Sequence, residues 1–429
     1  MEDMKRMLTE SSTTMPAFAD SKLPYMPFPT LLKRLKETNS FEDFVFNNSS
    51  NSELNITVVS SLFANHQPIS IIFHAPHGLD DTFSLISRMP KERLVFLRQL
   101  VVTSSHTYLS PQLGAIIALF PFLTTLHLTD SAFSHTSFEN TCASIGASSS
   151  LRWLFISKII IEETSSLRNL ANALVANTTI ERLELIGCEL TSAFISMILP
   201  AIGRKRPLRI LNLSNNALTK DAASLIANDG LTELTLASNS LSTSARCDLL
   251  MALKINTTLQ VLDFTYNSSP EYSRPADFAC DFLTYNSTLR ELKVSDIALH
   301  ATDISHLLDS LSRNTSLKLL YMRHPLKADV AASMLAYMFN TNSTLFSLFI
   351  NNLNIVYDID LEYLVRAMNT NATLIYLHAP LIKGYHQTRE RNKANHETKH
   401  TSLATLSFRQ FVRQIEPRPN APLIEHILL

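Results

Sequence analysis

One short segment carries the residue types of a metalloprotease centre. His396, Glu397 and His400 form an H-E-x-x-H motif. On a helix, two imidazoles at this spacing share one face and bind zinc, while the glutamate activates a metal-bound water. Glu416 or Glu425 could be nominated as a third ligand. However, the flanking residues are polar, and the segment that follows His400 is too short to build a cleft that excludes water. We therefore expect a solvated helix with no bound metal, and a zinc-dependent hydrolase is the alternative.

Other candidates for chemistry are weaker. His74 and His77, in "HAPHG", are spaced for a metal but have no cysteine or carboxylate pair nearby. Cys247 and Cys280 each precede an aspartate, as a nucleophilic cysteine can, but both fall in runs with helical spacing. A buried cysteine in such a run packs like a small apolar residue. No G-x-S-x-G elbow occurs. We therefore expect no enzyme activity and no cofactor.

Composition excludes several further classes. The chain has 429 residues, is 45% hydrophobic and has a formal net charge of −1, which does not favour binding to nucleic acid or to a membrane surface. Its first residues lack the apolar core of a secretory signal, and no apolar run is long enough to span a membrane. Its four cysteines form no CxxC pair, which is typical of reduced thiols. With only 7 glycines it has no glycine-rich phosphate loop. These features predict a cytoplasmic protein.

A repeated phrase organises the chain. The pattern L-x-x-L-x-L recurs at nearly constant intervals, and weaker matches extend it upstream. About thirteen units share one phase over residues 41–380, and the first three are degenerate. Their first apolar positions are Phe41, Ile69, Leu97, Leu123, Leu151, Ile180, Leu208, Leu231, Leu259, Leu289, Leu317, Leu345 and Leu374.

Each unit predicts a short strand, a loop and a helix. Leu208, Leu211 and Leu213 alternate as in a strand, whereas "TDISHLLDSLSRN" has helical spacing. The helical runs end at an asparagine followed by small polar residues, which we interpret as a helix stop in the left-handed conformation. The alternative is N-glycosylation, because each copy is a sequon, but a cytosolic chain would carry no glycan. The asparagines are Asn177, Asn256, Asn286, Asn314, Asn342 and Asn371.

These units resemble leucine-rich repeats. "LRILNLSNNAL" and "LTELTLASNSL" match the consensus L-x-x-L-x-L-x-x-N-x-L, and the long unit with a full helix is similar to the ribonuclease-inhibitor-like subclass. The resemblance implies an α/β horseshoe with parallel strands on its concave face and helices on its convex face. The consensus asparagine is matched at Asn216, Asn239 and Asn267, with Cys188 as an accepted alternative. Less regular loops are expected where it is replaced, at Ser131, Ile159, Ile297, Pro325 and Leu353. The step from Leu208 to Leu231 is the shortest, and it predicts a shortened helix in the unit that begins at Leu208.

The ends of the array need caps, because a solenoid exposes apolar coil at each end. Residues 1–40 are expected to form a disordered tail and a short capping helix, "FPTLLKRLKET". Residues 381–429 are expected to form a charged capping helix and a tail.

The concave face is the predicted binding surface. Residues between the buried strand positions point to this face. Two apolar groups occur there, separated by a stretch of mixed charge from Arg182 to Lys293. Aromatic residues and arginine are typical anchors of protein interfaces, although these rings could instead cover one another or the C-terminal tail. The candidate binding residues are Trp153, Phe155, Leu319, Tyr321, Arg323, Phe349, Tyr376 and His378.

The predicted function is a monomeric, non-enzymatic scaffold that binds a protein partner on the concave face. The resemblance also implies the alternative of a regulatory adaptor, an inhibitor or a bacterial effector that acts on a cytosolic target. For an effector, the location would be the cytosol of a host.

Overall fold

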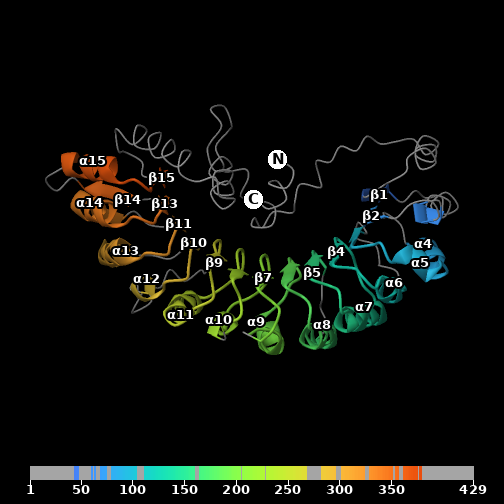
Figure 1. Ribbon diagram of the computed structural model, residues 1–429. Coiled ribbons are helices and arrows are strands. Elements are labelled where there is room, and N and C mark those ends of the chain that lie inside the picture. Colours follow the sequence, from blue (N-terminus) through green and yellow to red (C-terminus); the bar gives the residue numbers. More distant parts are fainter. Residues whose placement is uncertain are drawn as a thin grey trace.

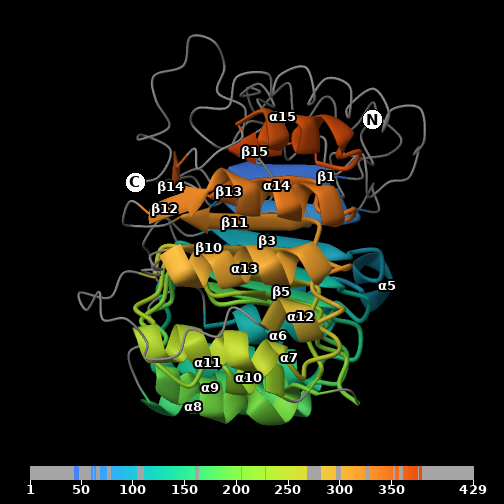
Figure 2. The ribbon, with the colours of Figure 1, turned by 90° about the vertical axis from the view of Figure 1, so that its left-hand side faces the viewer.

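The computed structural model describes residues 43–47, 59–60, 62–63, 68–74, 79–103, 111–159, 164–203, 205–227, 229–267, 282–295, 301–323, 328–350, 353–356, 361–374 and 376–378. The chain follows an arc in which strands line the inner side and helices the outer side (Figure 1). Successive helices stack in the order in which they occur along the chain (Figure 2). The predicted α/β solenoid is confirmed.

The inner layer is a thirteen-stranded sheet in which each strand pairs in parallel with the next unit's strand. Each strand begins one or two residues after the first apolar position of its unit, so the predicted phase is confirmed. The strands are β1 (Asp43–Asn47), β2 (Ser70–His74), β3 (Gln99–Thr103), β4 (Thr125–Thr129), β5 (Trp153–Ser157), β6 (Arg182–Ile186), β7 (Ile210–Asn212), β8 (Glu233–Thr235), β9 (Val261–Phe264), β10 (Glu291–Ser295), β11 (Leu319–Arg323), β13 (Ser347–Ile350) and β15 (Tyr376–His378).

The outer layer consists of helices of very different length. Within the described residues the longest helices have 13 residues, and three have only 4. The helices are α4 (Asp80–Ser87), α5 (Lys91–Leu94), α6 (Leu113–Leu119), α7 (His135–Ala147), α8 (Thr164–Ala176), α9 (Ser192–Ile198), α10 (Ser224–Ala227), α11 (Thr243–Leu253), α12 (Phe282–Tyr285), α13 (Ala301–Arg313), α14 (Ala332–Thr341) and α15 (Leu361–Thr370), with a 3₁₀ turn, η2 (Leu199–Ala201), after α9.

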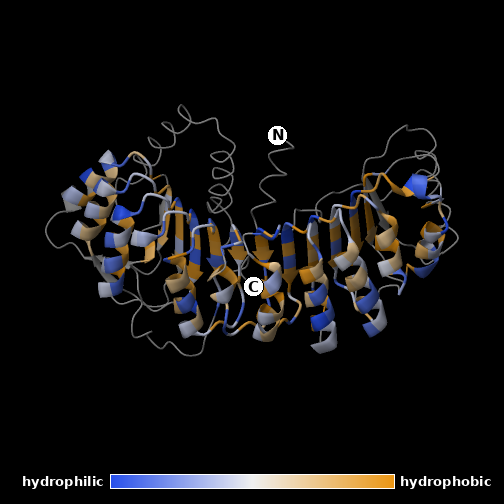
Figure 3. Cartoon of the chain, turned by 60° about the horizontal axis from the view of Figure 1, so that its bottom comes forward, coloured by the Kyte–Doolittle hydropathy of each residue, from blue (hydrophilic) through white to orange (hydrophobic). Residues whose placement is uncertain are grey.

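The core lies between the two layers and runs along the whole arc. Alternate strand residues are buried in it, and Figure 3 shows hydrophobic residues concentrated in the strands of the sheet. Leu211, Leu262, Leu292 and Leu348 are all buried, as their repeat positions predict. Ile69 differs, because it is 43% exposed and its unit buries Ile71 and Phe73 instead.

The consensus asparagines join neighbouring coils. The amide nitrogen of Asn239 donates to the carbonyl oxygens of Leu213 and Leu236, at 2.9 and 3.0 Å. Its amide oxygen accepts from the backbone N–H of Leu218 at 3.1 Å. Asn267 and Asn216 make equivalent bonds, and the Cys188 thiol donates to Ile156 O at 3.6 Å. The residue at this position therefore bonds loop backbone inside the coil and connects it to the preceding unit.

The sequon asparagines end their helices by a different means from the one predicted. Asn342 is extended, with φ −79° and ψ 123°, and none of the six lies among the described residues with positive φ. The left-handed residues instead stand one position before the consensus asparagine, after the strand, where the chain turns toward the outer layer. The residues at this position are Asp130, Lys158, Gly187, Asn215, Ser238 and Tyr266, and other described residues with positive φ lie elsewhere in the loops.

The sequon side chains form a ladder across the units. The amide nitrogen of Asn314 donates to Leu283 O and Asn286 O at 2.7 and 3.0 Å. Its amide oxygen accepts from the N–H groups of Ser316 and Leu317 at 3.0 and 2.7 Å. The other five asparagines make corresponding bonds and are equally buried. Glycosylation would modify this same buried nitrogen, so the geometry favours the structural interpretation.

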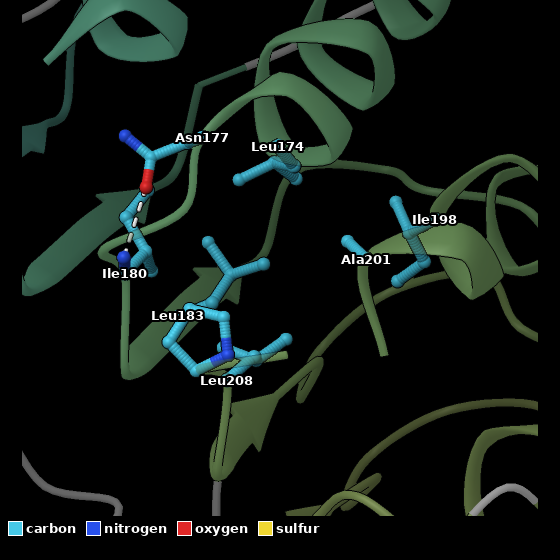
Figure 4. A pocket seen from close by; sticks show the side chains of 8 residues that line it. Leu174, Asn177, Ile180, Leu183, Ile198, Ala201 and Leu208 are labelled. Atoms are coloured by element: carbon cyan, nitrogen blue, oxygen red, sulfur yellow. Dashed lines mark hydrogen bonds between the residues drawn. The ribbon is translucent and has the colours of Figure 1, made fainter. Parts of the chain in front are cut away.

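The unit that begins at Leu208 is compressed, as the short step to Leu231 predicts. Its helix, α10, has 4 residues. The backbone closes tightly here, because a Cβ atom on Gly230 would lie 2.4 Å from the Gly203 nitrogen. Nearby, apolar side chains from α8, β6 and α9 line a small cavity (Figure 4). The volume in which the centre of a water molecule fits is about 10 Å³. This is roughly the space that one water molecule needs. The cavity is therefore a packing gap and not a ligand site.

Two loops that lack the consensus asparagine are more regular than predicted. In the units with Pro325 and Leu353, the residues after the inner strand form β12 (Ala328–Ala331) and β14 (Leu353–Val356), which pair in parallel as a second sheet. Backbone pairing between the two loops replaces the missing side-chain bonds. Ser131 bonds locally to Thr129 O at 2.6 Å, and Ile159 is buried. Ile297, the predicted caps at 1–40 and 381–429, and the H-E-x-x-H motif lie outside the described residues.

Candidate functional site

The concave face is a regular lattice of side chains. Strand pairing places the first strand residues of successive units in one row and the third residues in a second row. Adjacent positions in a row are about 4.8 Å apart. The first row runs Trp153, Arg182, Ile210, Glu233, Val261, Glu291, Leu319, Ser347 and Tyr376. The second row runs His127, Phe155, Glu184, Asn212, Thr235, Asp263, Lys293, Tyr321, Phe349 and His378.

Tyr321 and Phe349 form an aromatic pair near the C-terminal end of the second row. Their ring centroids are 4.5 Å apart and the rings are nearly parallel, at 15°. Both side chains are half-buried. They lie side by side because β11 and β13 pair in register, although a whole repeat unit separates them in the sequence. The aromatic pair therefore presents a flat, partly exposed apolar surface.

The other predicted residues around the aromatic pair differ in accessibility. Leu319 lies in the expected row, but only 2% of it is exposed, so it supports the surface and offers little contact area. The backbones of Tyr376 and His378 are in register with Ser347 and Phe349. Arg323 ends β11 opposite Ser295. The side chains of Tyr376, His378 and Arg323 lie outside the described part of the chain.

A second cluster lies at the other end of the face. The Trp153 ring is packed between the His127 ring, at 4.7 Å, and the Arg182 guanidinium, at 4.7 Å. Its indole N–H donates to the Glu184 carboxylate at 3.2 Å, and Arg182 Nε donates to the same oxygen at 2.7 Å. Phe155 was predicted to be exposed, but it is only 5% exposed and lies 5.0 Å from His127. Trp153 and Arg182 are thus the partly exposed members of a cluster that is held together by hydrogen bonds and ring contacts.

His127 is part of this cluster and was missed in the sequence. The row position that identifies Phe155 also identifies His127 one unit earlier, so the signal was present. Its ring is 5% exposed, and its Nε2 atom has no hydrogen-bond partner in the described structure. Burial, and to a lesser extent the charge of Arg182, lower the pKa of His127 from 6.5 to about 4. The buried imidazole is therefore neutral at neutral pH.

This buried imidazole predicts acid sensitivity. The pKa is lower in the folded chain than in the unfolded chain, so the unfolded chain binds the proton first as pH falls. The contribution of the neutral His127 side chain to the free energy of unfolding is therefore complete above pH 6.5. It is lost as the pH falls from 6.5 to about 4. The loss amounts to about 3 kcal/mol. Urea unfolding at pH 7.5 and pH 4.5 measures it. His127→Phe removes the titrating group, so its stability should fall less. An equal fall in the two proteins would contradict the prediction.

The centre of the face is rich in charge. Asp263 accepts from the Thr265 hydroxyl at 2.8 Å, and Lys293 Nζ lies 3.9 Å from its other oxygen. Burial, followed in effect by the neighbouring charges, raises the pKa of Glu233. Four carboxylates and two cations occupy this part of the lattice, namely Glu184, Glu233, Asp263 and Glu291 with Arg182 and Lys293. The predicted mixed-charge stretch is thus present and separates the two apolar clusters.

The described residues offer little for covalent or metal chemistry. Burial raises the pKa of the Cys247 thiol to about 11, whereas a nucleophilic cysteine needs a lowered pKa. Burial likewise raises the pKa values of Cys142 and Cys188 to about 12. Within the described residues no group of three or more histidine, cysteine or acidic side chains could hold a metal. His74 ends β2 with its side chain undescribed, and His77 and Cys280 lie outside the described residues.

No helix in the described part of the chain is both long and apolar enough to cross a membrane.

Comparisons with known proteins add the following. No protein-family model matches the chain. Two curated relatives, the leucine-rich repeat-containing protein 73 of rat and of human, are each 30% identical over 139 residues. The match covers 30% of this chain and 44% of each relative, so the chain spans less than half of their length. Among solved structures, the chain is similar to one in the crystal structure of a TLR13–ssRNA13 complex. That likeness has a TM-score of 0.42 and 15% identity, over 79% of this chain and 54% of the other.

The thirteen in-phase units pair as one parallel sheet backed by helices, and consensus asparagines join the coils. Both curated relatives are named as leucine-rich repeat-containing proteins. Together these findings identify the chain as a leucine-rich-repeat protein.

Proposed function

We propose that this chain is a non-enzymatic scaffold that binds a protein partner on its concave face through the aromatic pair, Tyr321 and Phe349. The observation that carries the proposal is the stacked, partly exposed pair beside the buried Leu319 and Ser347. Large rings that are central in an interface contribute most of its binding energy. Parallel strands hold them in place before binding, so little conformational entropy is lost on association.

The absence of an activity is part of the proposal. The raised pKa values of the three described cysteines oppose thiolate catalysis. Convex helices of up to 13 residues support placement in the ribonuclease-inhibitor-like subclass. A cytoplasmic location and a role as adaptor, inhibitor or effector belong to the same proposal. Identifying the partner would decide among these roles.

Truncating the aromatic pair should weaken partner binding without unfolding the chain. The Tyr321→Ala/Phe349→Ala variant removes two rings that lie outside the core between sheet and helices. We expect binding at least about tenfold weaker, because truncating a central ring typically costs about 2 kcal/mol or more. Affinity purification with quantitative mass spectrometry, followed by titration of the recovered partner, measures the loss.

Tyr337→Ala is the matched control, because Tyr337 is an exposed tyrosine on α14 of the outer layer. It should leave partner recovery unchanged. Trp153→Ala tests whether the second cluster belongs to the same footprint. If the double variant binds normally but melts much earlier, the rings serve packing and the proposed site is wrong.

A further inference from the structure

We infer that the partner presents an acidic residue next to an apolar one, and that Arg290 and Lys318 bind the acidic side chain at the rim beside the aromatic pair. This inference rests on the proposed function and specifies its partner. The relevant residues are those that directly precede each inner strand. These residues follow one another across the units through backbone bonds, such as Lys318 N–H to Arg290 O at 2.7 Å. They form a continuous rim at the edge of the sheet where the inner strands begin.

The rim is basic. From β3 to β13 its residues are Arg98, Thr124, Arg152, Glu181, Arg209, Thr232, Gln260, Arg290, Lys318 and Phe346.

Three of the five cations have structural partners. Arg98 donates to Val95 O at 2.7 Å, and Arg209 donates to Arg206 O at 2.6 Å. Arg152 forms an ion pair with Glu181 at 2.9 Å. These side chains stabilise loops or offset charge within the rim. These three cations therefore already have partners within the chain and do not need an external anion.

Arg290 and Lys318 differ from these three. Among the described residues neither side chain has an ion-pair or hydrogen-bond partner, and the two directly precede the adjacent strands β10 and β11. Like charges on adjacent strands destabilise a sheet unless an anion offsets them. Lys318 also lies 5.2 Å from the Phe346 ring centre, and its pKa is lowered by burial and by Arg290. An anion between the two would offset the repulsion and stabilise the charged form of Lys318.

The distance to the aromatic pair sets the spacing of the ligand. Lys318 and Tyr321 are three positions apart on the same chain segment, which is about 10 Å in extended geometry. The residues between them include the covered Leu319, so nothing prominent interrupts the surface. A partner in extended conformation would bridge the two sites with an acidic and an apolar residue about three positions apart.

The surrounding charges favour a short acidic segment over a polyanion. Glu291 and Glu233 lie in the neighbouring row, and neither has an ion-pair partner among the described residues. A continuous phosphate backbone that runs along the arc would meet these carboxylates. A peptide with one or two acidic side chains can place them at the rim alone.

The test uses the full chain and a random-peptide display library as the probe. Peptides selected by the wild-type chain should carry Asp or Glu about three positions from a large apolar residue. In titrations with one selected peptide, Arg290→Glu/Lys318→Glu should weaken binding at least about tenfold, because it juxtaposes like charges. Replacing the acidic residue of the peptide with Lys should restore binding to this variant. Arg152→Glu, a rim residue at the other end, should leave binding unchanged.

Other outcomes separate the two hypotheses. Peptides that depend on the aromatic pair but not on Arg290 and Lys318, or that lack acidic residues, would overturn this inference and leave the proposed function intact. If no selected peptide depends on Tyr321 and Phe349, the proposed function itself fails. Single-stranded oligonucleotides that bind through Arg290 and Lys318 while peptides do not would overturn the acidic-peptide assignment in favour of nucleic acid.

Discussion

Leu292→Asp is expected to lower the free energy of unfolding by about 4 kcal/mol or more. Leu292 lies inside β10 and is 1% exposed, among the buried leucines of the neighbouring strands. Its replacement removes a buried apolar side chain, which contributes about 2 kcal/mol. It also buries a carboxylate with no cation beside it, and this adds the larger cost. Urea unfolding followed by circular dichroism measures the change.

Leu292→Met is the matched control, because it preserves volume and polarity and should cost less than about 1.5 kcal/mol. A Leu292→Asp protein with an unchanged unfolding midpoint would refute the repeat register. The two concave rows would then be assigned to the wrong residues, and both functional proposals would lose their basis.

Asn314→Ala is expected to destabilise the chain by about 3–5 kcal/mol, far more than an average surface substitution. The change removes four hydrogen bonds and leaves two buried N–H groups without these partners. Leu283 O loses its bond to the Asn314 amide, and Asn286 O keeps only the Ser316 hydroxyl, at 3.4 Å. Each unsatisfied buried group costs about 1–3 kcal/mol, less whatever water can recover. Because coils contact only their neighbours, the loss should be local. Amide hydrogen exchange should therefore rise first in the units on either side of Asn314.

Asn340→Ala serves as the control for this prediction. Asn340 is exposed at the end of α14, where its amide nitrogen donates to the Tyr363 hydroxyl at 3.2 Å. Its removal should change stability by less than about 1 kcal/mol. If the two variants melted at the same temperature, the asparagine ladder would not stabilise the array.

Much of the fold was determined by the sequence alone. The L-x-x-L-x-L phrase locates all thirteen inner strands, the buried leucines and the shortened α10. It does so because each unit repeats the same local alternation, so an error in one unit is corrected by its neighbours. The consensus asparagine is predictable for the same reason, since its partners lie in its own unit and in the preceding one. The left-handed turn was misplaced, because a single asparagine can end a helix either through its backbone or through its side chain.

Only the tertiary structure decided which lattice positions are accessible and how their charges are paired. Phe155 and Tyr321 occupy the same row and have similar ring size, yet Phe155 is covered and Tyr321 is partly exposed. Arg152 has an ion-pair partner, whereas Arg290, at the equivalent rim position, has none in the described structure. These differences arise because exposure and charge pairing depend on the side chains one unit away, whose lengths and rotamers the repeat pattern leaves free. The periodicity therefore determines where a side chain points, and its neighbours across the sheet determine whether it can bind.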